Sequence, residues 1–134
     1  MNGRFLLDTN IIIALFAGEI KIHKRMATIS EVFVPCIAVG ELYFGAYKSF
    51  KVQENLTRID KFDLNNMVLF CDSGTAKKYG GIKNRLKEKA MPIPENDIWI
   101  ASLAQQYSLT LITRDKHFTI VDNFETGTFS IEIW

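Results

Sequence analysis

The chain has 134 residues, of which 48% are hydrophobic and 23% are charged, and its formal net charge is +1. This composition excludes a disordered chain, and the length suits one compact domain, which we place over residues 1–134. The charge total neither favours nor excludes nucleic acid as a partner, because a basic patch can exist on a nearly neutral protein.

The first half of the chain alternates short apolar strands with helices. Residues 5–7 (FLL) predict a buried strand, and the apolar run from Asn10 to Phe16 predicts a helix that Thr9 or Asn10 caps. The further elements expected here are helices over 19–30, 37–48 and 49–62 and a β-branched strand over 32–34, which ends at Pro35.

The second half continues this alternation. Residues 67–70 (MVLF) predict a strand, and Asp72-Ser73-Gly74 is typical of the start of a long helix over 73–90. Pro92 and Pro94 indicate a loop. The remaining elements expected are a helix over 97–107, a strand over 109–113, a loop and a last strand over 128–134. Strands alternating with helices favour an α/β fold, with a parallel sheet of about four to five strands covered by helices on both faces.

Four of the acidic residues occupy unusual positions in this scheme. Asp8 directly follows the first strand between two apolar runs, and Asp115 comes two residues after the strand 109–113. Glu41 lies in a mostly apolar helix, and Asp97 opens another. Taken singly, Asp97 is explained as a helix cap, Asp115 as a turn residue and Glu41 as a surface residue. Asp8 is the hardest to explain in this way.

In a parallel sheet these four carboxylates can converge on the carboxyl edge, where open α/β sheets place their sites. Each like-charged pair at about 4 Å costs roughly 4 kcal/mol at an effective dielectric near 20. Either some of the carboxylates are protonated or a cation lies among them. Oxygen ligands without His or Cys favour Mg²⁺ or Mn²⁺ over zinc.

Four segments carry a resemblance to a known family: FLLDTNIIIALF, IAVGELYFGA, NDIWIASLA and LITRDKHF. They resemble the signature segments of the PIN-domain nucleases, most closely the VapC type, the toxins of type II toxin–antitoxin pairs. The segments occur in the family's order and at its typical separations, and the resemblance covers nearly the whole chain.

The resemblance implies a PIN-like three-layer sandwich that acts as a Mg²⁺-dependent endoribonuclease, with Mn²⁺ as a substitute. It also implies a homodimer and inhibition by a small VapB-type antitoxin. The family's acidic set, catalytic and metal-binding, falls on Asp8, Glu41, Asp97 and Asp115, and its supporting polar roles fall on Thr9 or Asn10 and on Thr113.

These residues suit phosphodiester hydrolysis. We expect Asp8 and Asp97 to be the principal ligands of a first ion, while Glu41 and Asp115 complete the cluster and one of them orients the nucleophilic water. The number of ions, one or two, stays open. Thr113 would hydrogen-bond a carboxylate or a water.

Basic residues offer contacts for RNA. Arg114 and Lys116 flank Asp115, and we expect them to contact the RNA backbone. The basic run over 77–89 is explained more simply as a solvated helix face. His23 and His117 have no ligand or triad spacing, so both are expected to be surface or packing residues, and a Ser–His–Asp nucleophile is poorly supported.

Aromatic residues gather around the Glu41 helix. Most are expected in the core, and a few could line a groove for an antitoxin helix. They are Phe16, Tyr43, Phe44, Tyr47 and Phe50.

The cysteines and the N-terminus indicate the compartment. Cys36 and Cys71 form no C-x-x-C pair, are expected in the core, and fit a reducing cytoplasm. Asp8 interrupts what would be the apolar region of a signal peptide, and no apolar run approaches the length of a membrane span. We therefore expect a cytoplasmic protein without membrane association.

Two other interpretations are open. Asp8-x-Asn10 resembles the start of a haloacid-dehalogenase phosphatase, although that family has a second acid where Asn10 stands. A catalytically silent PIN-like module that only binds RNA or protein is the other, and the complete acidic set argues against it.

Overall fold

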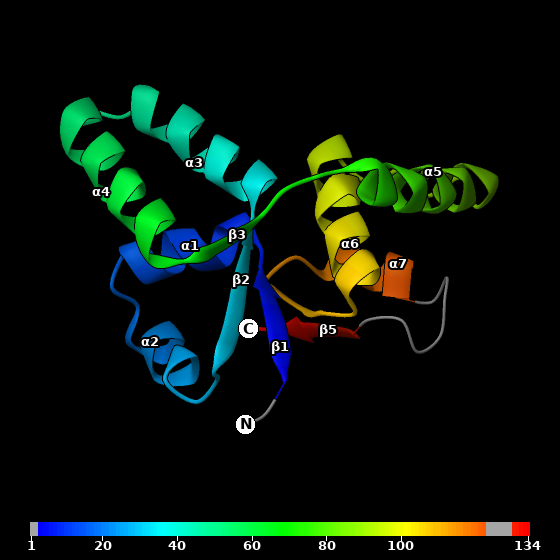
Figure 1. The fold of residues 1–134 in the computed structure, drawn as a ribbon, viewed down its shortest axis with the longest axis horizontal. Coiled ribbons are helices and arrows are strands. Elements are labelled where there is room, and N and C mark those ends of the chain that lie inside the picture. The colour runs from blue at the N-terminus through cyan, green and yellow to red at the C-terminus, as the bar shows by residue number, and fades with distance from the viewer. Residues whose placement is uncertain (1–2, 123–129) are drawn as a thin grey trace.

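The computed structural model describes residues 3–122 and 130–134, which form a five-stranded parallel sheet flanked by helices (Figure 1). The strand order is β3-β2-β1-β4-β5, and every neighbouring pair is parallel. The strands are β1 (Arg4–Leu7), β2 (Glu31–Pro35), β3 (Met67–Leu69), β4 (Thr110–Thr113) and β5 (Ser130–Ile133). The α/β sheet expected from the sequence is confirmed, while residues 128–129 of the expected last strand lie outside the described residues.

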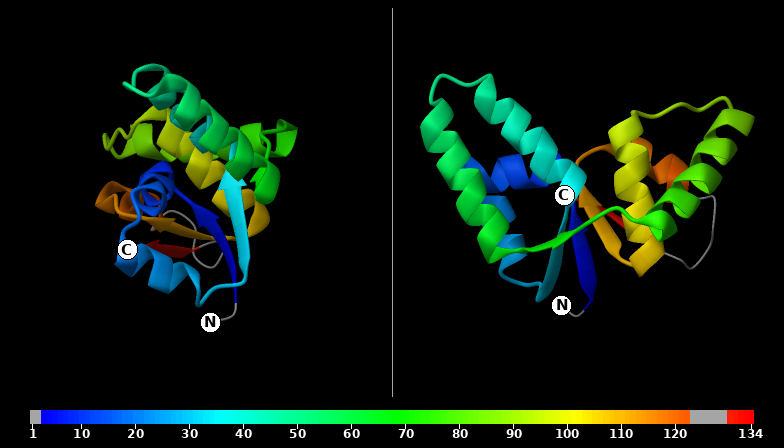
Figure 2. Two further views of the ribbon diagram at one scale, coloured as in Figure 1. Left: turned by 90° about the vertical axis from the view of Figure 1, so that its left-hand side faces the viewer. Right: turned by 45° about the horizontal axis from the view of Figure 1, so that its top comes forward.

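Helices cover both faces of this sheet. Figure 2 shows the α3–α4 pair and the α5–α6 pair diverging on the two sides of the strands. The helices are α1 (Thr9–Phe16), α2 (Ile20–Met26), α3 (Cys36–Tyr47), α4 (Val52–Asn65), α5 (Ser73–Glu88), α6 (Glu95–Tyr107), the 3₁₀ turn η1 (Lys116–Phe118) and α7 (Thr119–Asp122). Within the described residues, no helix has the length and apolar character needed to cross a bilayer.

Successive strand residues point to opposite faces of the sheet and pack into two separate hydrophobic cores. Leu6 and Leu111 belong to the cluster that includes residues of α5 and α6. Phe5, Leu7 and Ile112 belong to the cluster that includes residues of α1 to α4. Because both faces are buried, the strands read as continuous apolar runs and not as an alternation of apolar and polar residues.

The order of the strands places the carboxyl ends of β1 and β4 side by side in the middle of the sheet. From β1 the chain adds β2 and β3 on one side, and β4 and β5 on the other, so the winding direction reverses between β1 and β4. Open α/β sheets bind ligands outside the carboxyl ends of the strands at such a switch point. Asp8 follows β1 and Asp115 follows β4, so both acids flank it.

Two local expectations are corrected around these strands. The residue that caps α1 is Asp8, whose side chain accepts a hydrogen bond from the Thr9 N–H, and not Thr9 or Asn10. The segment after β4, expected as a loop, contains η1 and α7, because the fully buried Phe118 holds it against the core.

Some apolar side chains lie outside the core, contrary to expectation. Phe44 and Tyr47 are 64% and 66% exposed and Phe50 is fully exposed, since the end of α3 projects beyond the sheet. Cys71 is exposed as well, because it follows the edge strand β3, while Cys36 is half-buried.

Truncation of neighbouring strand residues tests the two-sided burial. We expect Leu111→Ala and Ile112→Ala each to lower the free energy of unfolding by about 2–5 kcal/mol, because each leaves a cavity in a different core. Leu64→Ala, at an 83% exposed position, is the matched control and should change it by less than about 0.5 kcal/mol. Chemical denaturation measures all three, and a tolerated truncation at either strand position would contradict the two-sided sheet.

Candidate active site

Asp8 is a buried carboxylate held by the ends of β1 and β4. Its backbone N–H donates to the Ile112 carbonyl at 2.9 Å, which extends the pairing of the two strands. The Thr9 N–H donates to Oδ1 at 2.8 Å, and the Thr113 hydroxyl donates to Oδ2 at 2.7 Å. The side chain is only 4% exposed, and both of its oxygens accept hydrogen bonds.

The environment of Asp8 disfavours its ionised form. Burial raises the pKa of Asp8 to about 6, and the hydrogen bonds from Thr113 and Thr9 lower it only in part. The negative charges of Asp97 and Glu41 add to the increase in this pKa. The carboxylates of Asp97 and Glu41 are therefore close enough to Asp8 for their charges to act on it.

Glu41 is joined to Asp8 through one intervening residue. It lies on the second turn of α3, and its Oε1 accepts a hydrogen bond from the Thr9 hydroxyl at 2.8 Å. Since Thr9 also donates its backbone N–H to Asp8, the first residue of α1 contacts both acids.

Thr113 is the centre of a second polar network. Its hydroxyl is buried, donates to Asp8, and accepts from the Asp115 N–H at 3.0 Å and from Asn10 Nδ2 at 3.5 Å. Asn10 Oδ1 in turn accepts from the Arg114 N–H at 3.2 Å. The structure thus places Thr9, Asn10 and Thr113, the residues to which the resemblance gives supporting polar roles, within hydrogen-bond contact of the acids or of one another.

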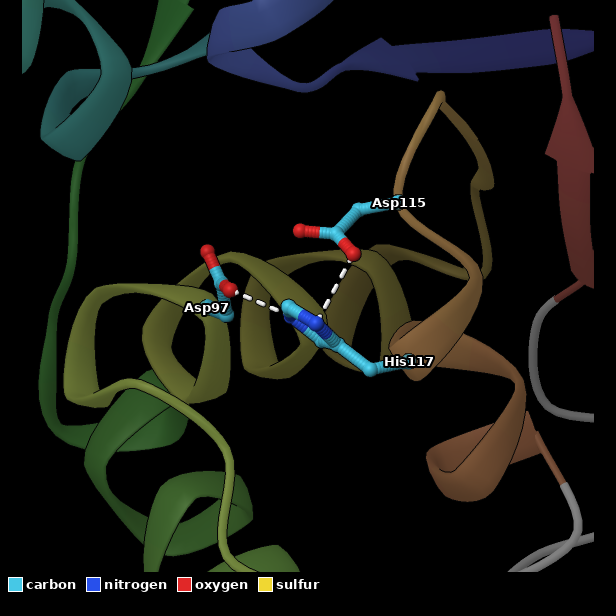
Figure 3. A group of neighbouring side chains, drawn as sticks. All are labelled: Asp97, Asp115 and His117. Atoms are coloured by element: carbon cyan, nitrogen blue, oxygen red, sulfur yellow. Dashed lines mark hydrogen bonds and ion pairs between the residues drawn. The ribbon is translucent and has the colours of Figure 1, made fainter.

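Asp97, Asp115 and His117 form the tightest group of the site (Figure 3). His117 Nε2 lies 2.7 Å from Asp97 Oδ2, and its Nδ1 lies 2.8 Å from Asp115 Oδ1. The expectation that His117 is a surface or packing residue is therefore wrong. Its separation of two from Asp115 matches no ligand pattern, and only the 3₁₀ turn η1 brings the ring between the two carboxylates. His23, by contrast, is exposed on α2.

Neither of these aspartates serves to cap its own helix. Asp97 lies in the first turn of α6, whose N-cap is Pro94, and Asp115 precedes η1 without a side-chain capping bond. Burial raises the pKa of Asp97, the hydrogen bond and charge of His117 lower it, and the charge of Asp115 raises it further. The two side chains are thus free to face the site.

The acidic group fits a divalent cation. Asp97, Asp115 and His117 each offer one ligand atom, and these atoms lie within 4.8 Å of one another. Asp8 and Glu41 stand outside this closest group. Asp8 interacts electrostatically with both Asp97 and Glu41, since each of these charges raises the pKa of Asp8. Hard carboxylate oxygens suit Mg²⁺ or Mn²⁺. A cation would also offset the mutual repulsion that contributes to the raised pKa of Asp8.

The basic residues beside Asp115 differ from each other. Arg114 is engaged in a two-pronged ion pair with Glu19, with distances of 2.6 and 3.1 Å between the guanidinium nitrogens and the carboxylate oxygens. Lys116 is exposed on η1. Lys116 is therefore the more accessible of the two predicted RNA contacts, because the Arg114 guanidinium is already paired with Glu19.

Fold and site together define an α/β protein with an acidic site at the switch point of a parallel sheet. The family description "PIN domain" matches residues 5–123 of the chain. Ribonuclease VapC2 of Haemophilus influenzae is 32% identical over 114 residues, which cover 84% of this chain and 86% of that protein. The chain belongs to the PIN-domain family and, within it, to the VapC type.

Two further similarities extend over almost the entire chain. The tRNA(fMet)-specific endonuclease VapC of Shigella flexneri is 29% identical and covers 95% of this chain and 98% of its own length. A chain in the crystal structure of DNA-bound VapBC from Salmonella typhimurium superposes with a TM-score of 0.84 at 28% identity, covering 98% of both chains.

The raised pKa of Asp8 predicts a dependence of stability on pH in EDTA. The folded protein binds the Asp8 proton more tightly than the unfolded chain does, so this group favours folding most below its ordinary pKa of 3.8. The advantage is lost as the pH rises to about 6, with a magnitude of up to about 3 kcal/mol. We expect the free energy of unfolding to fall between pH 4 and 7, and to fall less in Asp8→Asn. Denaturation curves with equal pH slopes for the two proteins would contradict the shift.

Proposed function

We propose that the protein is a divalent-metal-dependent endoribonuclease that acts as the toxin of a toxin–antitoxin pair. The observation that carries the proposal is the convergence of Asp8, Glu41, Asp97 and Asp115 on the carboxyl edge of the sheet. The names of the VapC relatives, a ribonuclease and a tRNA-specific endonuclease, support it.

The four acids divide into two pairs in the proposed reaction. Asp8 and Asp97 would hold the ion, and Glu41 and Asp115 would complete its surroundings, with one of the two orienting the attacking water. When bound, a Mg²⁺ or Mn²⁺ ion supplies an acidified water and neutralises the phosphate charge. Thr113 and Thr9 fix Asp8 and Glu41 through their hydroxyl groups, so these carboxylates keep their direction when the RNA arrives.

RNA reaches the site beside η1 in this proposal. Lys116 contacts the phosphate backbone, and Arg114 joins it when its ion pair with Glu19 opens. The name of the Shigella flexneri relative makes structured tRNA the first substrate to test.

Asp8→Asn tests the metal-dependent activity. It retains the side-chain volume but removes the charge, and we expect cleavage of a tRNA pool to fall by at least about 100-fold. Asp63→Asn, which removes an exposed carboxylate from α4, is the matched control and should cleave at the wild-type rate. Gel analysis of cleavage products measures both.

The same assay tests whether cleavage depends on a divalent metal ion. EDTA should stop cleavage by the wild type, and Mg²⁺ or Mn²⁺ should restore it. Full activity in Asp8→Asn or in EDTA would refute the proposed mechanism. A wild type that binds Mn²⁺ but cleaves no RNA would indicate the catalytically silent module instead.

A groove beside Glu41 supports the proposed antitoxin. It has a volume of about 330 Å³ and lies between α1, α3 and α4. Its lining is mostly apolar and consists of Ile13, Phe16, Ala17, Glu41, Leu42, Gly45, Ala46, Asn55, Arg58 and Ile59. An apolar antitoxin helix would fill it, with a basic side chain directed at Glu41. The homodimer that the family implies is likewise proposed, and sedimentation analysis measures it.

A charge placed in this groove should separate inhibition from activity. Ile13 is 55% exposed in its lining, and we expect Ile13→Asp to weaken neutralisation by the antitoxin at least about tenfold, because it puts an unpaired charge into an apolar contact. Leu64→Asp, which places the same charge at an 83% exposed position outside the groove lining, is the control. Growth on co-expression with a cognate antitoxin, to be sought in the reading frames next to this gene, measures neutralisation, and RNA cleavage should be unchanged in both variants.

A further inference from the structure

We propose that His117 is a positioning residue that holds the carboxylates of Asp97 and Asp115 in the orientation that the metal requires. This inference rests on the proposed function, since it concerns the same acidic site. His117 does not belong to the acidic set of the family, and no spacing in the sequence marks it.

The His117 ring lies between the two carboxylates and contacts one oxygen of each. Each carboxylate uses one oxygen to contact the ring, Oδ2 of Asp97 at 2.7 Å and Oδ1 of Asp115 at 2.8 Å. In Figure 3 the second oxygen of each carboxylate points away from the ring. The imidazole thus occupies one oxygen of each aspartate and leaves the other available to an ion.

The ring lies between two carboxylates that would otherwise repel each other. Asp97 belongs to α6 and Asp115 to the segment after β4, and the charge of Asp115 raises the pKa of Asp97. Within residues 3–122 and 130–134, the ion pairs formed by these two carboxylates are both with His117. Without the ring, repulsion would turn the two side chains away from each other.

The backbone beneath the ring is firmly placed. Phe118 is fully buried in the core next to α6, and its N–H donates to the Asp115 carbonyl at 3.4 Å. The Thr119 hydroxyl donates to the Lys116 carbonyl at 2.7 Å and secures the same turn. Because this turn is held in place, the His117 ring has little conformational freedom and can fix the two carboxylates that it contacts.

Direct coordination of the ion by His117 is the competing role. The three ligand atoms lie close enough together for it. However, both ring nitrogens already contact carboxylates, so coordination would break one of these contacts, whereas the outward-facing oxygens need no rearrangement. The positioning role is therefore the one that the observed arrangement favours.

Metal affinity and cleavage rate, measured in the same set of variants, test the proposal. His117→Leu removes the ring's contacts with both carboxylates, and we expect the affinity for Mn²⁺, measured by EPR titration, and kcat for RNA to fall by about 10–100-fold each. His117→Gln can donate to one carboxylate and should recover part of both. His23→Leu is the control, because its exposed ring hydrogen-bonds the Leu15 carbonyl on α1 and not the acids, and it should behave as the wild type.

Pulsed EPR of the Mn²⁺-loaded wild type separates the two roles. A positioning residue predicts no directly coordinated nitrogen, and a nitrogen coupling from His117 would overturn the proposal. Wild-type Mn²⁺ affinity and cleavage in His117→Leu, with unchanged thermal unfolding in EDTA, would overturn it as well. A wild type that binds Mn²⁺ without cleaving RNA contradicts the proposed function, and the affinities of the His117 variants then still decide this inference.

Discussion

The hydrogen bond from the Thr113 hydroxyl to Asp8 spans the two strands between which the winding of the sheet reverses. A buried carboxylate is expensive unless it is paired, and here strand ends supply the partners. The pairing of β1 with β4 places Thr113 next to Asp8, and the same hydroxyl accepts the N–H of Asp115. One threonine therefore sets the separation of two acids that lie more than a hundred residues apart.

The site gathers negative charge at a cost in stability. The increase in the pKa of Asp8 to about 6 measures how poorly its surroundings accept a charge. Neighbouring side chains offset part of this cost at all four carboxylates. The Thr9 hydroxyl donates to Glu41 and the Thr113 hydroxyl to Asp8, while His117 contacts Asp97 and Asp115. Natural proteins accept such strain where function needs preorganised ligands, and the apolar flanks of Asp8 provide the rigid support.

The sequence predicts the parallel sheet and the four acids because both follow from local pattern. Buried strands are continuous apolar runs, and acids that closely follow such runs, here Asp8 and Asp115, lie at the carboxyl edge of the sheet. Glu41 and Asp97 stand out by their places on helices, Glu41 in a mostly apolar helix and Asp97 in a first turn. His117 escaped this reasoning because its position depends on a 3₁₀ turn held by Phe118, which is a tertiary effect. The exposure of Phe44, Tyr47 and Phe50 was missed for a related reason, since the composition of a helix does not say how far it projects beyond the sheet.

Glu41 belongs both to the groove between α1, α3 and α4 and to the surroundings of Asp8. In the proposed function, the antitoxin in the groove and the cation at the acids would therefore share one carboxylate. Thermodynamic reciprocity then requires that each changes the affinity of the other by the same factor. An occupant that brings a positive charge to Glu41 would loosen the ion, and the ion would loosen that occupant. Under the proposed function, the concentration of divalent cations would thus be one of the variables that set how tightly the antitoxin binds in this groove.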